Sequence, residues 1–448
     1  MSTSKAVLTG LLWVESKDLT PKQLQEVKQR YTYPHPYEDT SFSTYIELDG
    51  RIGVPFGDKQ KVKRLLPELS ITDKRVDTPV DKPFKFSLRL RPYQKEVVKG
   101  IFKFIHNGGT EFNLAGKPSS GKTITLAAIL AKLGVKTLII ANQSMLISQI
   151  YEEMSQNTTA NVKVLTASDF SLTDINIATS QFISQNKDVW YALKKGVGCV
   201  VLDEAHSLAS PSTTRIIQKI YAKYSIFISA TFTRSVDART EALTDFAGHK
   251  TFTLVNDALI VPKIMMIQCP ERYPRYVSKF QAARDKAKFF DQQSIFDKVE
   301  LLTEASLKKG RQVLIVTDVV NMQEALAESL KAYGVGILNG STKAAERRDI
   351  LSRYATGEIK ILIGGMVLNA GLSIPRITTI IRVAFPSSGE KNVQIVGRAL
   401  RTFEGKDGAF IFDLVFQGKS SKEREEAYKA NGYAVTHHSW DKIKEKIC

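Results

Sequence analysis

The sequence predicts an α/β protein with two lobes, each built on a parallel β-sheet, preceded by a small α+β domain. The main observation is that short apolar runs alternate with amphipathic segments of helical spacing from about residue 86 onward. Such alternation is typical of parallel sheets covered by helices. A second observation is that residues 1–85 have a different pattern, with short alternating runs and turn glycines.

The first 85 residues form the predicted α+β domain. The segment "TPKQLQEVKQRY" has helical spacing, with Thr20 suited to cap the helix and Pro21 to its first turn. The alternating segment "STYIELDGRIGVPFG" predicts a hairpin. The polar, proline-containing segment "TDKRVDTPVDKPFKF" is typical of a linker to the next domain.

The rest of the chain divides into predicted lobes at 86–258 and 259–448, with the join near "VNDALIVPK". Segments such as "GKTITLAAILAKLG" and "NMQEALAESLKAYG" have the spacing of covering helices. The predicted strands are "KTLIIAN", "GVGCVVLDEAH" and "YSIFISATF" in the first lobe, and "RQVLIVTD", "KILIGG" and "TTIIRVA" in the second.

Composition limits the possible functions. Lys and Arg number 63 against 46 Asp and Glu, a net charge of +17 that favours a polyanionic partner, although a basic and inert surface stays open. No apolar run is long enough to cross a bilayer, and the polar N-terminus does not resemble a signal peptide. The three scattered cysteines, Cys199, Cys269 and Cys448, indicate a reducing compartment without a disulfide framework or a zinc site. We therefore expect a cytoplasmic protein.

The segment "GKPSSGKT" follows an extended stretch and opens an apolar helix, which is the context of a phosphate-binding loop. Its glycines allow backbone N–H groups to turn toward phosphate oxygens at a helix N-terminus. The lysine would bridge the β- and γ-phosphates of ATP, and the threonine hydroxyl would hold Mg²⁺. The predicted nucleotide-binding residues of this loop are Gly116, Ser119, Ser120, Gly121, Lys122 and Thr123.

The segment "VVLDEAH" delivers two acids at the carboxyl end of a predicted strand, where open α/β sheets bind their ligands. Asp203 would hold the Mg²⁺ through water, and Glu204 would orient or deprotonate the attacking water. In isolation the two acids could equally cap the following helix. Behind a phosphate-binding loop, the catalytic interpretation is favoured.

The order of these motifs resembles that of the superfamily 2 helicases and translocases, with "DEAH" at 203–206 and "SAT" at 229–231. The resemblance covers most of the chain after residue 86 and implies two RecA-like motor lobes. "LRPYQKE" resembles the adenine-reading Q motif, with Gln94 as the reader and Tyr93 as a stacking partner. "LIIANQSMLISQ" and "IATSQ" stand where motifs Ia and Ib contact the nucleic-acid backbone. By the same resemblance, His206, Ser229 and Thr231 couple the nucleotide to the bound strand.

Three further motifs extend the resemblance into the second lobe. "VLIVTD" resembles motif IV, "GLSIP" resembles motif V, and "QIVGRALR" resembles motif VI. The resemblance gives Gly371 a place at the nucleotide and Gln394 a coupling role. Arg398 and Arg401 are three residues apart on a predicted helix, so they share a face and can act as arginine fingers on ATP. Ser373 replaces an aspartate that is common in motif V, so that carboxylate role is in doubt.

The sequence therefore predicts an ATP- and Mg²⁺-dependent DNA helicase. The motif set is most similar to phage UvsW-type and RecG-like enzymes, which implies forked and Holliday-type DNA in replication, recombination or repair. The same resemblance implies the cytoplasm of a bacterium or a phage-infected host. An RNA helicase with the same motor stays open because the motor motifs carry little 2′-hydroxyl information. A nucleic-acid-binding protein with an ATP-gated switch is a third alternative, against which the complete hydrolytic set argues.

Residues 1–85 allow two interpretations. By resemblance they could bind duplex or junction DNA, with the aromatic side chains stacking on bases. They could equally support the first lobe without contacting DNA, in which case these aromatic residues belong to a core. The aromatic residues concerned are Tyr31, Tyr33, Tyr37 and Phe42.

Overall fold

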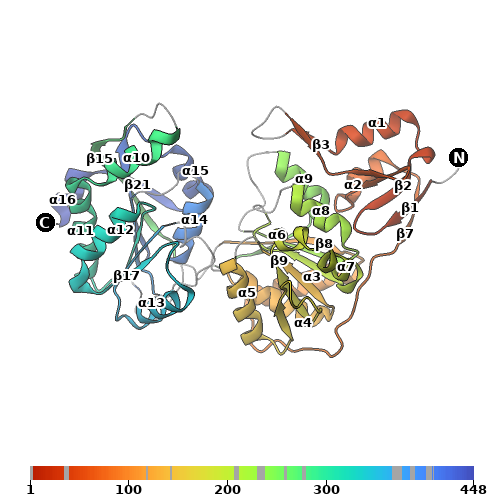
Figure 1. The fold of residues 1–448 in the computed structure, drawn as a ribbon, viewed down its shortest axis with the longest axis horizontal. Coiled ribbons are helices and arrows are strands. Elements are labelled where there is room, and N and C mark those ends of the chain that lie inside the picture. The colour runs from red at the N-terminus through yellow and green to blue at the C-terminus, as the bar shows by residue number, and fades with distance from the viewer. Residues whose placement is uncertain are drawn as a thin grey trace. The chain divides into compact units, whose positions relative to one another are not determined.

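The computed structural model divides into two compact units, Met1–Val255 and Asn256–Cys448. Figure 1 shows the course of the chain through both. The structure describes residues 4–34, 40–117, 120–141, 144–205, 211–229, 238–256, 260–274, 279–365, 376–383, 389–399, 406 and 408–447. No helix within these ranges is long and apolar enough to cross a membrane.

The N-terminal domain is a five-stranded mixed sheet with two α-helices, which agrees with the predicted α+β class. Only the pair β1–β7 is parallel. The predicted hairpin is β5–β6, whose Asp49–Gly50 turn has φ angles of 49° and 71°. Such positive angles at both positions favour Asp-Gly in a two-residue turn. In spatial order the strands are β5 (Ile46–Leu48), β6 (Arg51–Val54), β2 (Leu12–Glu15), β1 (Ser4–Leu8) and β7 (Leu69–Asp73).

The two helices of this domain are α1 (Pro21–Arg30) and α2 (Lys59–Leu65). The Thr20 side chain accepts a hydrogen bond from the Gln23 N–H at 3.2 Å, which confirms the predicted cap. A separate hairpin follows α1 and consists of β3 (Thr32–Pro34) and β4 (Ser41–Ser43).

The first lobe contains a seven-stranded sheet in which every pairing is parallel. The three strands predicted from the sequence in this lobe are β9, β12 and β13. In spatial order the strands are β10 (Val162–Val164), β11 (Ile175–Ala178), β9 (Thr137–Ile140), β12 (Cys199–Leu202), β13 (Tyr224–Ser229), β8 (Glu111–Gly116) and β14 (Thr251–Leu254).

Helices cover both faces of this sheet, as buried side chains on each face show. On one face lie α3 (Pro92–His106), α4 (Lys122–Leu133) and α5 (Ser144–Asn157). On the other lie α6 (Ser180–Gln185), α7 (Lys187–Gly196), α8 (Pro211–Lys219) and α9 (Ala238–Ala247).

The second unit repeats this architecture with another seven-stranded, all-parallel sheet. In spatial order its strands are β17 (Val335–Leu338), β18 (Ile361–Gly364), β16 (Val313–Val316), β19 (Thr379–Arg382), β20 (Phe410–Gln417), β15 (Lys263–Arg272) and β21 (Ala434–Ser439). Two parallel seven-stranded sheets therefore confirm the predicted fold class.

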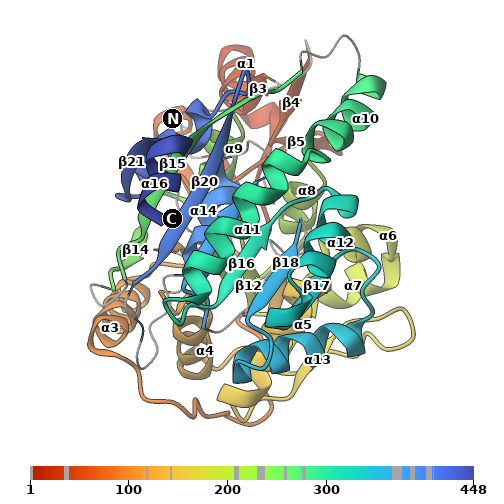
Figure 2. The same cartoon turned by 90° about the vertical axis from the view of Figure 1, so that its left-hand side faces the viewer.

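Helices also cover both faces of the second sheet. Figure 2 shows α11 and α12 lying across it. One face carries α11 (Gln293–Leu307), α12 (Val320–Ser329) and α16 (Trp440–Ile447). The other face carries α13 (Ala344–Thr356), α14 (Gly389–Arg398) and α15 (Lys422–Ala430). Helix α10 (Lys279–Phe290) precedes α11 in the chain.

The N-terminal domain packs against the first lobe through a buried polar cluster around Asp245 of α9. Its carboxylate accepts hydrogen bonds from the Tyr33 hydroxyl at 2.6 Å and the Thr44 hydroxyl at 3.1 Å, and pairs with the Lys61 ammonium at 2.7 Å. The Lys61 ammonium also lies 4.1 Å from the centre of the Tyr31 ring. A side chain at Gly57 would overlap the Phe246 carbonyl, so the backbones approach closely here. The domain is thus a fixed part of the first unit.

The aromatic residues around this cluster belong to the core of the N-terminal domain. Tyr31 and Tyr33 are 1% and 5% exposed, so they belong to the core and do not present rings for base stacking. Phe42 is partly buried, with its ring centre 5.8 Å from that of Tyr33. Tyr37 lies outside the described residues.

The segment predicted as a linker is not free of the lobe. Its first residues belong to β7, and the following residues pair with the first lobe through bridges from Val76 to Ala222 and from Pro79 to Val135. These long-range backbone pairings are the physical reason for the difference from the sequence pattern, which records only local polarity.

Replacing Asp245 with alanine is expected to loosen the N-terminal domain and to destabilise the first unit by about 1–3 kcal/mol, because buried hydroxyls lose their acceptor. Thermal denaturation and protease cleavage between residues 74 and 86 measure this. Glu241→Ala, at an exposed position of the same helix, is the control and should leave both unchanged. Equal behaviour of the two variants would show that the cluster does not hold the domain.

Candidate active site

The predicted catalytic motifs meet at the carboxyl edge of the first sheet. Strand β13 lies between β12 and β8, with Phe227 opposite Leu202 and Ser229 opposite Ala115. The phosphate-binding loop leaves β8, the two acids leave β12, and Ser229 ends β13. Three segments far apart in the sequence therefore end side by side, at the edge where parallel sheets bind ligands.

The described end of the phosphate-binding loop has the backbone that anion binding at a helix N-terminus requires. Gly121 has φ 81° and immediately precedes α4, so the loop turns through a left-handed residue into a helix N-terminus. The Lys122 ammonium donates a hydrogen bond to the Gly116 carbonyl at 2.8 Å, which folds the side chain back over the loop. A Cβ at Gly116 would overlap the Ser120 hydroxyl oxygen, so a larger residue there would have to displace that hydroxyl.

The residues of this loop fit a bound phosphate group. The Ser120 hydroxyl is buried and has no hydrogen-bond partner among the residues that the structure describes. A buried hydroxyl without a partner is costly, and a phosphate oxygen would satisfy it. Thr123 is partly exposed in the first turn of α4, one residue after Lys122. Its hydroxyl is therefore available to a cation beside the phosphates.

The two acids lie where β12 ends. Burial and the Glu204 carboxylate raise the pKa of Asp203, and the Lys122 ammonium opposes this. A divalent cation favours the ionised carboxylate, so this environment fits a metal-binding aspartate. Glu204 itself has φ 48°, a left-handed conformation that costs a non-glycine residue about 1–3 kcal/mol. The Ala205 N–H to Ile228 carbonyl bond, at 2.8 Å, holds the chain after it. Such strain is typical of functional positions.

Helix α3 contacts the loop through two side chains. The Tyr93 hydroxyl donates to the Ser120 carbonyl at 2.9 Å, and the Gln94 amide donates to the Gly121 carbonyl at 3.3 Å. The Gln94 carbonyl oxygen accepts the Arg91 N–H at 2.9 Å. The structure thus gives both residues a role in positioning the loop, which the sequence predicted for neither. Adenine reading by Gln94 stays a prediction.

The other predicted site residues lie at the end of β13, in α14 or outside the described ranges. Ser229 is fully buried at the end of β13. Helix α14 includes positions 394 and 398, whose side chains lie outside the description. The predicted residues outside the described ranges are Ser119, His206, Thr231, Gly371, Ser373 and Arg401.

A buried ionic network in the second unit holds α14, and the motif analysis did not find it. Asp413 of β20 pairs with Arg382 of β19 at 3.1 Å and with Arg424 of α15 at 2.9 Å. Arg382 also donates to the Asn392 side chain of α14 at 2.6 Å. All three charged side chains are at most 4% exposed. The available signal was a charged residue within each of two apolar runs, "TTIIRVA" and "FIFDLVF".

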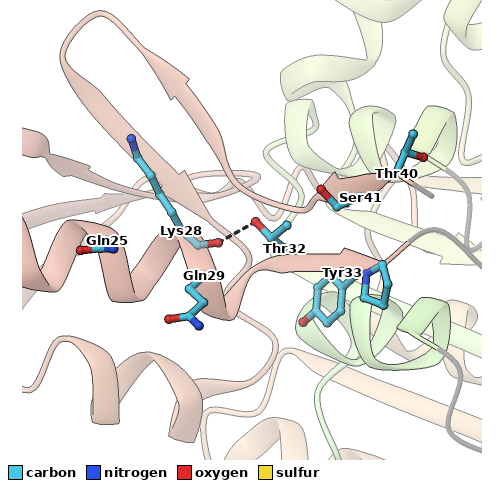
Figure 3. A pocket seen from close by; sticks show the side chains of 8 residues that line it. Gln25, Lys28, Gln29, Thr32, Tyr33, Thr40 and Ser41 are labelled. Atoms are coloured by element: carbon cyan, nitrogen blue, oxygen red, sulfur yellow. Dashed lines mark hydrogen bonds between the residues drawn. The ribbon is translucent and has the colours of Figure 1, made fainter.

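A groove on the N-terminal domain, lined by none of the predicted site residues, is shown in Figure 3. It has a volume of about 580 Å³ and lies between α1 and the β3–β4 hairpin. The Thr32 hydroxyl donates to the Lys28 carbonyl at 2.7 Å, and the Lys28 ammonium pairs with Glu47 at 2.7 Å. Its one lining lysine is therefore neutralised, and we assign no chemistry to the groove.

Comparisons with known proteins agree with this arrangement. The family "Type III restriction enzyme, res subunit" matches residues 87–234, and "Helicase conserved C-terminal domain" matches residues 297–403. The probable helicase D10 of Escherichia phage T5 is 25% identical, over 81% of this chain and 80% of D10. The DNA 3'-5' helicase XPB of Mycobacterium tuberculosis is 23% identical, over 66% of this chain and 56% of XPB.

The chain spans only 58% and 51% of two fungal relatives, irc3 of Schizosaccharomyces pombe and IRC3 of Saccharomyces cerevisiae. Among solved structures, S. cerevisiae Dbp5 bound to RNA and ADP BeF3 covers 80% of this chain and 97% of Dbp5, with a TM-score of 0.56 and 17% identity. That likeness concerns the fold alone. With these two family models in order along the two lobes, and with a probable helicase similar over most of both chains, the chain belongs to the superfamily 2 helicases and is an ATPase.

Proposed function

We propose that this protein is an ATP-dependent DNA helicase or translocase that unwinds or branch-migrates forked and Holliday-type DNA. The observation that carries the motor assignment is the meeting of the phosphate-binding loop and the two acids at one sheet edge. The finer assignment to branched DNA rests on the resemblance of the motif set to UvsW-type and RecG-like enzymes.

The residues divide the hydrolytic work between them. The loop N–H groups and Lys122 bind the phosphates, and Glu204 orients the attacking water and accepts its proton. Thr123 and Asp203 would hold Mg²⁺, which supplies charge neutralisation on the phosphates. From the resemblance of motif VI, we assign Arg398 and Arg401 to stabilising the charge of the transition state.

Coupling to the strand is assigned from the same resemblance. Loss of the γ-phosphate changes the contacts that bias a two-state lobe motion, and the strand is gripped alternately. The proposed couplers are His206, Ser229, Thr231 and Gln394, and Gly371 is proposed to contact the nucleotide.

The names of relatives support DNA as the polyanion. Several relatives bear names that specify DNA, such as the Mycobacterium XPB.

The charge distribution limits the role of the N-terminal domain. The net charge of +17 is not concentrated in this domain, because residues 1–85 carry 14 Lys and Arg against 12 Asp and Glu. The balanced charge and the buried contact with α9 favour a supporting role for this domain over a DNA-binding one.

ATP turnover tests the proposal. We expect turnover to rise when DNA is added, and to rise most with a four-way junction. Single-stranded DNA, duplex DNA, a four-way junction and single-stranded RNA are compared at one salt concentration, because phosphate contacts are salt-dependent. Preferential stimulation by RNA would replace DNA with the alternative substrate, and no stimulation by any of them would contradict a nucleic-acid motor.

A further inference from the structure

Helices α7 and α8 of the first lobe present a cluster of lysine and aromatic side chains that the hydrolytic site does not use. Trp190 and Tyr191 are adjacent on α7, with ring centres 4.6 Å apart. The Lys194 ammonium lies 5.6 Å from the Trp190 ring, and the Lys219 ammonium of α8 lies 5.0 Å from it. Positions four apart share a helix face, so Tyr191 and Lys195 lie together as well.

The same cluster continues beyond the end of α8. The Tyr221 ring lies 5.1 Å from the Lys194 ammonium and 5.8 Å from the Lys195 ammonium. We refer to these six side chains as the lysine–aromatic surface. It consists of Trp190, Tyr191, Lys194, Lys195, Lys219 and Tyr221.

Among the described residues, the lysines of this surface have no acidic partner. Within the described part of the chain, no carboxylate lies within ion-pair distance of Lys194, Lys195 or Lys219. The nearby Asp77 pairs instead with Lys223 at 3.2 Å. Three positive charges therefore lie together without a counter-charge, which favours an anionic partner.

The aromatic rings indicate which kind of anion. Tyr191 is 64% exposed, the ring of a large side chain directed to solvent beside unpaired lysines. Exposed rings next to cations are the combination that binds single-stranded nucleic acid, because bases stack on the ring and phosphates contact the ammonium groups. Bases of a duplex are already stacked on one another, so the ring favours a single strand.

Helix-dipole stabilisation explains the positions of the lysines but not those of the aromatic side chains. Lysines in the last turn of a helix interact favourably with its carbonyl end. That effect accounts for Lys194 and Lys195 at the end of α7 and Lys219 at the end of α8. It requires no aromatic side chain, and it does not explain an exposed tyrosine one turn before Lys195.

The surface is separate from the nucleotide site. Helices α7 and α8 end directly before β12 and β13 begin, so Lys195 and Lys219 lie near the amino ends of these strands. The phosphate-binding loop, Asp203 and Glu204 follow the carboxyl ends. The two regions therefore occupy opposite edges of one parallel sheet.

We propose that the lysine–aromatic surface is a second contact site for single-stranded nucleic acid, at the edge of the first lobe opposite the nucleotide. This inference rests on the proposed function for the identity of the polyanion. A strand held there would stay attached while the motor site releases and rebinds.

Two variants test the two components of the site. Lys195→Ala/Lys219→Ala removes two phosphate contacts. The slope of log affinity against log salt for a labelled oligothymidylate is negative, and its magnitude should decrease by about 1.4. Tyr191→Ala should weaken oligothymidylate binding at least about fivefold, whereas Tyr191→Phe keeps the ring and the affinity. Fluorescence anisotropy measures both, with thermal denaturation to establish that the variants fold.

Lys308→Ala/Lys309→Ala is the matched control. These two exposed lysines directly follow α11, and their substitution removes the same amount of charge from another part of the surface. A salt slope that changes no more than in this control overturns the proposal, as does unchanged oligothymidylate binding by Tyr191→Ala. Stimulation of wild-type ATP turnover by saturating oligothymidylate is measured in parallel. It reports on the proposed function, so a failed motor and a failed second site give different results.

Discussion

Replacing Glu204 with glutamine is expected to reduce ATP turnover by about 10²–10⁴-fold while ATP and DNA binding are retained. A general base contributes a factor of this size. Glutamine has the same shape but cannot accept a proton from water. Steady-state hydrolysis and equilibrium binding of a fluorescent ATP analogue, measured on the same preparation, separate catalysis from binding.

Glu153→Gln is the matched control for this substitution. The Glu153 carboxylate of α5 is close enough to raise the pKa of Asp203, and it accepts a hydrogen bond from Gln149 at 2.7 Å. Neutralising it removes a carboxylate from the same region without removing the proposed base. We expect its turnover to stay within a few-fold of wild type. Wild-type turnover by Glu204→Gln would show that the assignment of Glu204 is wrong.

The same substitution tests the alternative of an ATP-gated binding protein. Such a switch needs nucleotide affinity that changes nucleic-acid affinity, and it does not need a base. In one outcome, ATP changes the DNA affinity of Glu204→Gln as much as it changes that of wild type, while the variant no longer releases DNA over time. That result would show that hydrolysis drives the release of DNA. If wild type itself shows no release after hydrolysis, the switch is favoured over the motor.

Most of the fold could be predicted because buried strands and covering helices each have a characteristic spacing of apolar residues within a short segment. The strands β9, β12, β13, β16, β18 and β19 all coincide with apolar runs in the sequence. The Asp49–Gly50 turn and the Thr20 cap depend on the chemistry of one or two residues. The contact between the N-terminal domain and α9 depends on Tyr33 and Asp245, which are 212 residues apart, and no local pattern records that pairing.

The chemistry of the candidate site could also be predicted from short segments of the sequence, whereas its geometry could not. The phosphate-binding loop and the two acids are contiguous motifs, so their chemistry could be inferred before their positions were known. The left-handed backbone at Glu204 and the bond from Tyr93 to Ser120 depend on the packing of neighbouring segments. The lysines and rings of α7 and α8 likewise become one surface only when two helices lie together.

The network around Asp413 gives the largest expected effect on stability. Asp413→Asn should lower the free energy of unfolding of the second unit by about 3–5 kcal/mol, because Arg382 and Arg424 would stay buried without a counter-charge. The unit is best followed by hydrogen exchange of β19 and β20 amides, since unfolding of a two-unit chain is not a single transition.

Acid should reproduce part of this loss. Burial raises the pKa of Asp413, but the charges of Arg382 and Arg424 outweigh it, so the pKa lies below its usual value. A depressed carboxyl pKa stabilises the fold above the unfolded-state pKa, and the contribution is lost as pH falls through the folded value. Asp413→Asn should therefore lack this component of acid sensitivity.

Glu358→Gln provides the contrast that makes the test decisive. Glu358 pairs with Arg353 at 2.7 Å, but both side chains are about half exposed, so its loss should cost less than about 1 kcal/mol. A similarly small effect at Asp413 would mean that the buried arginines reach water or another anion. A large effect, together with faster exchange in α14, would show that the bond from Arg382 to Asn392 transmits it to the helix that carries Arg398.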